Sequence, residues 1–127
     1  MSDFVLKLEN GIWYGVFPRL EVLNIVHGFT CRLHGQSDLV ASELNMALHV
    51  GDNVQKVIAN RKKVAMALGF DLNKVTTCAQ VHGNNIALVT KKNVGSGATD
   101  YAQTIGSVDG LVTNLKQVPL MLFFADC

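Results

Sequence analysis

The sequence predicts a fold of mixed helix and strand, of the α/β or α+β class. Several short apolar runs have the length of β-strands, whereas one longer segment, residues 53–68, has the periodicity of an α-helix. The chain of 127 residues can bury one hydrophobic core, and its 49% hydrophobic and 17% charged residues are typical of globular proteins. We therefore expect strands packed against one principal helix.

The first two strands are predicted to form a hairpin. Residues 4–8 alternate apolar and polar side chains, as a half-buried strand does, and Gly11 provides the turn to residues 12–17. Pro18 ends the second strand. A third strand is expected at residues 24–31, ahead of a polar loop.

The predicted helix has signals at both ends. Asp52 is a favourable N-cap, and Gln55 three residues later completes a capping-box pattern. Gly69 stands where a C-terminal stop is expected. We therefore expect the helix to begin at Asn53 and to end at Leu68.

One arginine lies within the apolar stripe of this helix. On a helical wheel the stripe contains Val54, Val57, Ile58, Val64, Ala65 and Leu68. If the stripe is buried, the Arg61 guanidinium must be paired or bound to an anion, because an unpaired buried charge is very costly. If the helix is rotated, or the side chain extends to the helix edge, Arg61 is solvated instead. The sequence leaves both alternatives open.

The second half of the chain is predicted to be rich in strands. We expect them at residues 75–81, 85–91, 108–113 and 118–124. The glycine-containing loop at residues 93–99 is not followed by a helix with the spacing of a phosphate-binding loop, so it is assigned no nucleotide role.

Composition narrows the class of protein. The net charge is +1, from 11 basic and 10 acidic residues without a basic run, so we expect no nucleic-acid partner. The N-terminus does not resemble a secretory signal, and the longest apolar run, residues 118–125, is too short to span a bilayer. The three cysteines form no paired motif, which fits a reducing compartment. We expect a cytoplasmic protein without a membrane partner, and Cys31 and Cys78 as small buried hydrophobes.

A histidine and a cysteine follow two of the predicted strands. His82 ends the stretch Gln80-Val81-His82, and Cys127 follows Ala125-Asp126. Ligands in open α/β sheets gather beyond the carboxyl ends of strands, where an imidazole and a thiolate suit zinc, and also copper. A catalytic zinc site uses three protein ligands. None of the other histidines has a ligand-like spacing to this pair; these are His27, His34 and His49.

Two interpretations of His82 and Cys127 that involve no metal are also consistent with the sequence. Cys127 could act as a nucleophile with His82 as its base, while Asp126 or Gln80 orients the imidazole or an oxyanion. Alternatively, the two residues are an ordinary loop histidine and an ordinary buried cysteine. The H-x-E and P-C-x-x-C signature of zinc deaminases is absent.

A series of separated motifs resembles the YfiH/laccase-domain family. In chain order they are Phe29-Thr30-Cys31-Arg32, residues 44–52 (LNMALHVGD), Asn60-Arg61, Gln80-Val81-His82-Gly83, Asp109-Gly110-Leu111-Val112-Thr113 and Ala125-Asp126-Cys127. The resemblance covers nearly the whole chain. It implies a layered α/β fold shared with the cytotoxic-necrotizing-factor cysteine enzymes. It also implies that residues 1–127 are the N-terminal portion of one such domain, as the end of the chain directly after an apolar strand suggests.

The resemblance implies a metal site as well. The family holds its metal with the histidine of Q-V-H, the cysteine of A-D-C and a histidine in a downstream H-x-G-W motif. The first two correspond to His82 and Cys127, and the third has no counterpart in this chain. The loop after Arg32 departs from the family pattern, because His34-Gly35 stands where Gly-Gly is usual.

The implied activity is that of a zinc-dependent purine nucleoside phosphorylase, with adenosine deaminase and methylthioadenosine phosphorylase activities. Its substrates would be adenosine, inosine, guanosine and methylthioadenosine, together with phosphate. A cation must hold the phosphate beside the ribose, and Arg32 and Arg61 are the candidates. Ser37, Asn45 and Gln80 are candidate contacts to the sugar or the base.

Three alternatives accompany this expectation. The first is a copper-dependent polyphenol oxidase of laccase type. The second is a metal-free hydrolase that acts on peptidoglycan precursors through Cys127 and His82. The third is a non-catalytic fragment, because two ligands alone would hold zinc weakly.

Overall fold

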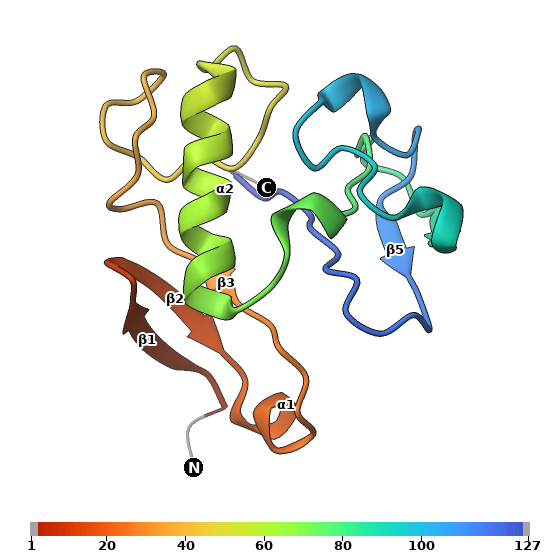
Figure 1. Ribbon diagram of the computed structural model, residues 1–127, viewed down its shortest axis with the longest axis horizontal. Coiled ribbons are helices and arrows are strands. Elements are labelled where there is room, and N and C mark those ends of the chain that lie inside the picture. Colours follow the sequence, from red (N-terminus) through yellow and green to blue (C-terminus); the bar gives the residue numbers. More distant parts are fainter. Residues whose placement is uncertain (1–2, 126–127) are drawn as a thin grey trace. The chain divides into compact units, whose positions relative to one another are not determined.

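The computed structural model in Figure 1 describes residues 3–125. The chain divides into two compact units, residues 1–69 and 70–127. Among the described residues, the first unit contains a three-stranded antiparallel sheet and the longest helix, and the second contains a two-stranded parallel sheet. The mixed α/β class is therefore confirmed. That the chain forms part of one larger domain stays a prediction.

The predicted N-terminal hairpin is confirmed. Strand β1 (Val5–Glu9) pairs with β2 (Ile12–Val16), which pairs in turn with β3 (Phe29–Thr30). Asn10 and Gly11 both have positive φ, 47° and 74°, which is the geometry of the tight turns that suit the twist of a hairpin. The turn chemistry of Asn-Gly thus sets the register of the sheet.

The third strand is much shorter than predicted, because a histidine fixes the segment before it in a turn. Helix α1 (Pro18–Val22) begins at a proline, whose ring presets a helical φ. His27 then accepts the N–H of Phe17 on Nε2 (2.7 Å) and contacts the Ile25 oxygen through Nδ1 (2.8 Å). Its imidazole also stacks on the Phe17 ring. Both ring nitrogens are therefore engaged within the first unit.

Helix α2 (Val54–Leu68) matches the predicted helix to within one residue. The predicted N-cap was wrong, however: the Asn53 side chain, not that of Asp52, accepts the N–H groups of Gln55 and Lys56. The Asp52 carboxylate is turned towards the preceding loop instead. Gly69 adopts the left-handed conformation at the C-terminus with φ 76°, as predicted.

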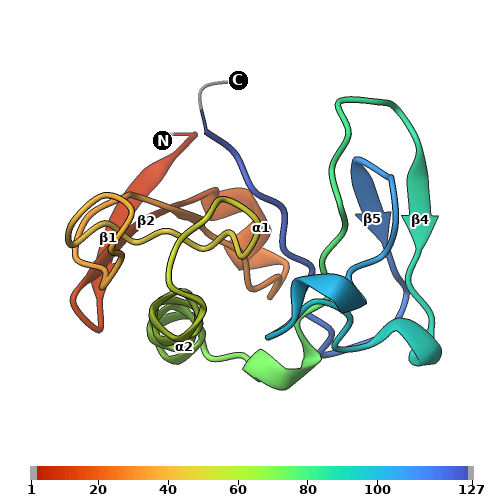
Figure 2. The same ribbon diagram turned by 90° about the horizontal axis from the view of Figure 1, so that it is seen from above.

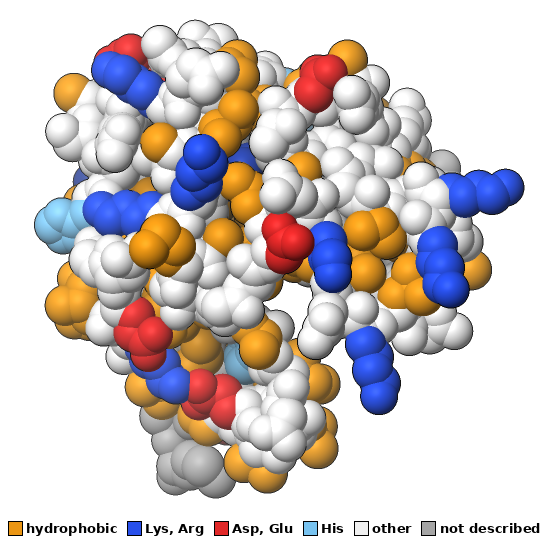
Figure 3. Space-filling model, in the orientation of Figure 1, with side chains coloured by type: hydrophobic (Ala, Val, Ile, Leu, Met, Phe, Trp, Pro, Cys, Tyr) orange, Lys and Arg blue, Asp and Glu red, His pale blue; other side chains and the backbone are white. Residues whose placement is uncertain are grey.

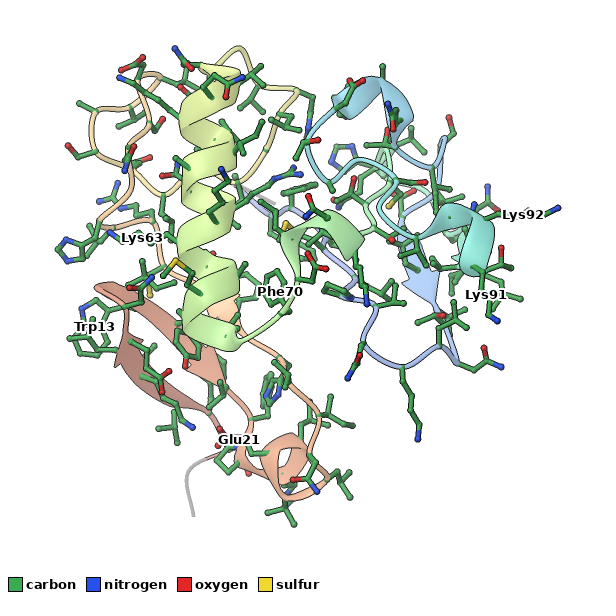
Figure 4. All side chains as sticks on the ribbon, viewed as in Figure 1. Trp13, Glu21, Lys63, Phe70, Lys91 and Lys92 are labelled. Atoms are coloured by element: carbon green, nitrogen blue, oxygen red, sulfur yellow. The ribbon has the colours of Figure 1, made fainter. Side chains whose placement is uncertain are left out.

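Helix α2 packs against the sheet of its own unit. Figure 2 looks along the helix and shows β1 and β2 on one side of it. In β2 the side chains of Ile12, Tyr14 and Val16 are buried, as is Gly15, whereas Trp13, labelled in Figure 4, is only partly buried. The buried residues of the helix are Val57, Asn60, Arg61, Val64 and Ala65. The predicted stripe is thus confirmed at its centre, whereas Val54 at its start is 46% exposed.

In the second unit, β4 (Ile86–Leu88) pairs in parallel with β5 (Gly110–Val112), and Figure 2 shows the two arrows side by side. These strands confirm the first half of the predicted strand at residues 85–91 and the centre of that at residues 108–113. Short 3₁₀ helices form much of the connections: Leu72–Lys74, Lys91–Asn93 and Tyr101–Gln103.

The other two predicted strands of this unit form no regular ladder. Residues 75–78 are fully buried and extended, but they are joined to their neighbours only by isolated parallel bridges, Thr76 to Leu120 and Cys78 to Ile105. Pro119 has no N–H to donate, so a continuous ladder is interrupted beside Thr76. The apolar run at residues 75–78 therefore predicted burial correctly, but the prediction of regular strand pairing was wrong for both segments.

Apolar side chains also reach the surface. The face in Figure 3 carries hydrophobic side chains among charges of both signs. Strand β1 forms as predicted, but the prediction that its apolar face is buried was wrong: Leu6 and Leu8 are 57% and 53% exposed, whereas Lys7 between them is partly buried. No helix within residues 3–125 has the length and apolar character needed to cross a membrane.

Candidate functional site

The histidine of the Gln80-Val81-His82-Gly83 stretch lies on a turn held by one carboxylate. Asp109 Oδ1 accepts the N–H groups of Val81 (2.9 Å) and His82 (2.8 Å), and its Oδ2 accepts that of Gly83 (2.8 Å). His82 has φ 60°, in the left-handed region. The extended segment therefore ends before His82, and the exposed imidazole does not continue its alternation.

The carboxylate that holds this turn is itself fixed by the parallel sheet. Asp109 directly precedes β5, and Asn85 directly precedes β4. The Asp109 N–H donates to the Asn85 oxygen (2.9 Å). Burial alone would raise the pKa of Asp109, but the three N–H groups, that of Gly83 foremost, outweigh it and lower the pKa. Asp109 is therefore an anion at neutral pH.

Gln80 joins the two segments that lead towards the predicted metal ligands. Its Oε1 accepts the N–H of Phe123 (2.8 Å), and its Nε2 donates to the Phe123 oxygen (3.1 Å). Together with the parallel bridge from Thr76 to Leu120, this pairing sets the carboxyl ends of the two segments side by side. Cys127 and Asp126 lie outside the described residues. The predicted contact of Gln80 to substrate stays a prediction.

Cys78 and Cys31 differ from each other in burial. Cys78 is 2% exposed, and burial, followed by the nearby Asp109 charge, raises its pKa, so it is a neutral thiol, as predicted for a structural cysteine. Cys31 is only partly buried. Within residues 3–125, no three His, Cys, Asp or Glu side chains are grouped closely enough to hold a metal ion.

In the first unit, a second aspartate gathers two of the predicted substrate contacts. Asp52 Oδ2 accepts the Ser37 hydroxyl (2.6 Å) and the Asn45 amide (2.9 Å). Its Oδ1 accepts three backbone N–H groups, those of Asp38, Leu39 and Asn53. Burial by itself raises the pKa of Asp52, yet the bonds from Asn45, Ser37 and the backbone hold it far below its usual range. Asp52 thus organises the loop that precedes α2.

Two residues of α2 anchor the same loop. Asn60 Oδ1 accepts the Gln36 N–H (2.7 Å), and its Nδ2 donates to the Asn45 oxygen (2.9 Å). Arg61 Nε donates to the Met46 oxygen (2.8 Å). Arg61 is 1% exposed, so the alternative of a solvated arginine at the helix edge is wrong. Burial lowers the pKa of Arg61 to about 10, which leaves it charged at neutral pH.

The predicted phosphate contact Arg32 has different surroundings. Its Nη1 donates to Glu43 Oε1 (2.9 Å), and its side chain is 78% exposed. The Glu43 backbone oxygen in turn accepts the Ser37 N–H (3.1 Å). Arg32, Ser37 and Asn45 therefore lie in one loop of the first unit, which Arg61 anchors from α2. Gln80 and His82 belong to the second unit.

Replacing Asp52 with asparagine in the full-length protein should lower the free energy of unfolding at pH 7 by about 2 kcal/mol, because hydrogen bonds to a charged group contribute about 1.5–3 kcal/mol. The folded pKa lies below the unfolded value of about 3.9, so this contribution is complete above that value and is lost as the pH falls towards the folded pKa. The difference between wild type and variant should therefore shrink below about pH 4. Urea denaturation over a pH series measures it.

The matched control is Asp38→Asn in the same loop. The exposed Asp38 carboxylate pairs with Lys56, and such surface pairs contribute about 0–1 kcal/mol. Equal effects of the two substitutions at pH 7 would contradict the special role of Asp52.

The sequence of the chain is similar to a protein family and to several named proteins. Residues 26–127 match the family model described as multi-copper polyphenol oxidoreductase laccase. Over 102 residues, the chain is 45% identical to "Purine nucleoside phosphorylase YlmD" of Geobacillus stearothermophilus, covering 80% of this chain and 37% of that protein. Over 103 residues it is 37% identical to the YlmD protein of Bacillus subtilis, covering 81% and 37%.

Solved structures show the same likeness. A crystal structure of a Bacillus licheniformis hypothetical protein, YfiH, superposes with a TM-score of 0.75 at 42% identity, covering 79% of this chain and 38% of that one. The crystal structure of YlmD from Geobacillus stearothermophilus also gives a TM-score of 0.75, at 45% identity, covering 79% and 37%. The chain thus spans little more than a third of the length of these relatives.

Proposed function

We propose that this chain, which belongs to the family described as multi-copper polyphenol oxidoreductase laccase, is part of a zinc-dependent purine nucleoside phosphorylase. Several relatives of the chain are named purine nucleoside phosphorylases. Adenosine deamination and methylthioadenosine phosphorolysis are included in the proposal. The observation that carries it is the pairing of Gln80 with Phe123, which brings together the segments leading to His82 and Cys127.

His82 and Cys127 are the proposed metal ligands in this chain, and a further ligand would come from outside it. The chemistry of these donors fits zinc, because an imidazole nitrogen and a thiolate are its usual protein ligands. The exposed His82 imidazole on a fixed turn also fits that role. When bound, zinc supplies a Lewis acid and a water of lowered pKa.

The remaining proposed residues bind and orient substrate. In phosphorolysis a phosphate oxygen bonds to the anomeric carbon of the ribose while the glycosidic carbon–nitrogen bond breaks and the purine leaves. Arg32, whose guanidinium is largely exposed, suits a phosphate anion. The bonds from Ser37 and Asn45 to Asp52 hold both side chains in fixed orientations, as contacts to a sugar or base require.

The second candidate is a copper-dependent polyphenol oxidase, which the printed description of the family favours. Reduction of oxygen by four electrons usually uses several copper sites, whereas the proposed ligands supply one centre. We therefore rank it below the phosphorylase.

The deciding experiment measures metal content and turnover of the purified full-length protein. We expect zinc at about one ion per chain and release of hypoxanthine from inosine that depends on added phosphate. Copper-dependent oxidation of a phenol without any phosphorolysis would overturn the proposal. If metal-free protein hydrolyses a peptidoglycan precursor, and alkylation of Cys127 stops that hydrolysis, the metal-free hydrolase would be favoured instead.

A further inference from the structure

The turn that carries His82 is unfavourable by itself. A non-glycine residue with φ near 60° crowds its own Cβ against the backbone, so His82 needs support to stay in this conformation. Three successive N–H groups, those of residues 81–83, point to the same side of the turn. The Asp109 carboxylate accepts all three and thereby offsets the cost of the turn.

Asp109 can impose this geometry because the sheet fixes its own position. Its N–H is bonded to the Asn85 oxygen, and the next residue, Gly110, is paired with Ile86 across β4 and β5. The carboxylate therefore belongs to the residue directly before a paired strand, whose position the sheet fixes. A residue held by a rigid element positions its partner more accurately than one on a free loop.

The other side of the turn is fixed as well. Gln80, two residues before His82, is bonded twice to the backbone of Phe123. The backbone on both sides of His82 is thus restrained, while the imidazole itself is exposed. A ligand that is already held in its bound conformation loses less freedom when it binds.

We propose that Asp109 is a positioning residue for the metal ligand His82: it presets the backbone of residues 81–83 so that the imidazole is presented to the ion. This rests on the proposed function. Asp109 would act through the N–H groups of the turn, which its carboxylate accepts. Outer partners of metal ligands typically affect metal affinity by about 10- to 100-fold.

The test is zinc affinity, measured on the full-length protein by competition with a chromophoric chelator. We expect Asp109→Ala to weaken zinc binding by about 10- to 100-fold, and Asp109→Asn to weaken it less, because the amide oxygen still accepts N–H groups. Amide hydrogen exchange of residues 81–83 should be fastest in Asp109→Ala and intermediate in Asp109→Asn. This measurement does not depend on enzyme activity.

Gly83→Ala is a second way to disturb the same contact. A Cβ there would lie 3.2 Å from Asp109 Oδ2, so the carboxylate must shift by a few tenths of an ångström. We expect a smaller loss of zinc affinity, of about threefold to tenfold. This variant carries the test if Asp109→Ala does not fold.

The matched control is Asp100→Ala. Asp100 caps the 3₁₀ helix Tyr101–Gln103 by accepting the Ala102 N–H, so its loss affects local structure without touching the His82 turn. We expect its zinc affinity to match that of wild type. Equal zinc affinity of wild type, the Asp109 variants and Gly83→Ala would overturn this inference alone. Wild-type protein that binds no zinc would overturn the proposed function and the inference with it.

Discussion

Replacing His82 with asparagine in the full-length protein is expected to remove the bound zinc and to lower kcat/KM for inosine phosphorolysis about 1,000-fold. A metal contributes several kcal/mol to transition-state stabilisation, and each 1.4 kcal/mol or so corresponds to a factor of ten. Asparagine is the suitable replacement because it tolerates the left-handed φ of 60° that His82 adopts. Elemental analysis and hypoxanthine release measure the two effects.

His34→Asn provides the control for this substitution. His34 is also exposed and also has positive φ, 67°, but it lies in the loop of the first unit. Backbone strain and loss of an imidazole are therefore matched, and only the proposed ligand role differs. Full metal content and full activity in His82→Asn would show that His82 is an ordinary loop histidine.

Replacing Arg61 with leucine should leave helix α2 intact but raise the KM for phosphate about tenfold, because the buried Arg61 anchors the loop that carries the proposed phosphate contact Arg32. Leucine favours helices, so the helical content seen by circular dichroism should not change. The Met46 oxygen loses its donor, which costs about 1–3 kcal/mol of stability. Steady-state kinetics at varied phosphate, together with urea denaturation, measure both effects.

Lys62→Leu is the matched control, because Lys62 is the next residue along α2 and is exposed. It removes one positive charge without touching the loop anchored by Arg61. Unchanged stability and unchanged phosphate dependence in Arg61→Leu would show that Arg61 does not position the loop of the proposed phosphate contact.

Short-range patterns in the sequence predicted the N-terminal hairpin and the C-terminal end of α2 correctly. Both depend on residues whose backbone preference acts locally, Asn10 and Gly11 in the turn and Gly69 at the helix end. The N-cap was misplaced because Asp52 and Asn53 are both good caps by type. Only the contacts of Asp52 with Ser37 and Asn45, distant in sequence, decide between them.

The roles of Asp52 and Asp109 could not be predicted for the same reason. Each carboxylate accepts N–H groups from residues that no periodicity connects to it, and aspartate is a common turn residue whatever its contacts. The apolar runs at residues 75–81 and 118–124 predicted burial, but not the interruption beside Pro119. The motif made His82 a candidate ligand, which stays a prediction, but it did not indicate the left-handed backbone of that residue.

The supports of the His82 turn also bear on when it can form. Val81 is 28 residues from Asp109 in sequence, and Gln80 is 43 residues from Phe123. Contacts between residues this far apart form slowly, because a long loop must close before they contribute. During synthesis His82 therefore leaves the ribosome before Asp109 and Phe123, and the two supports of its turn can form only after those residues have been made.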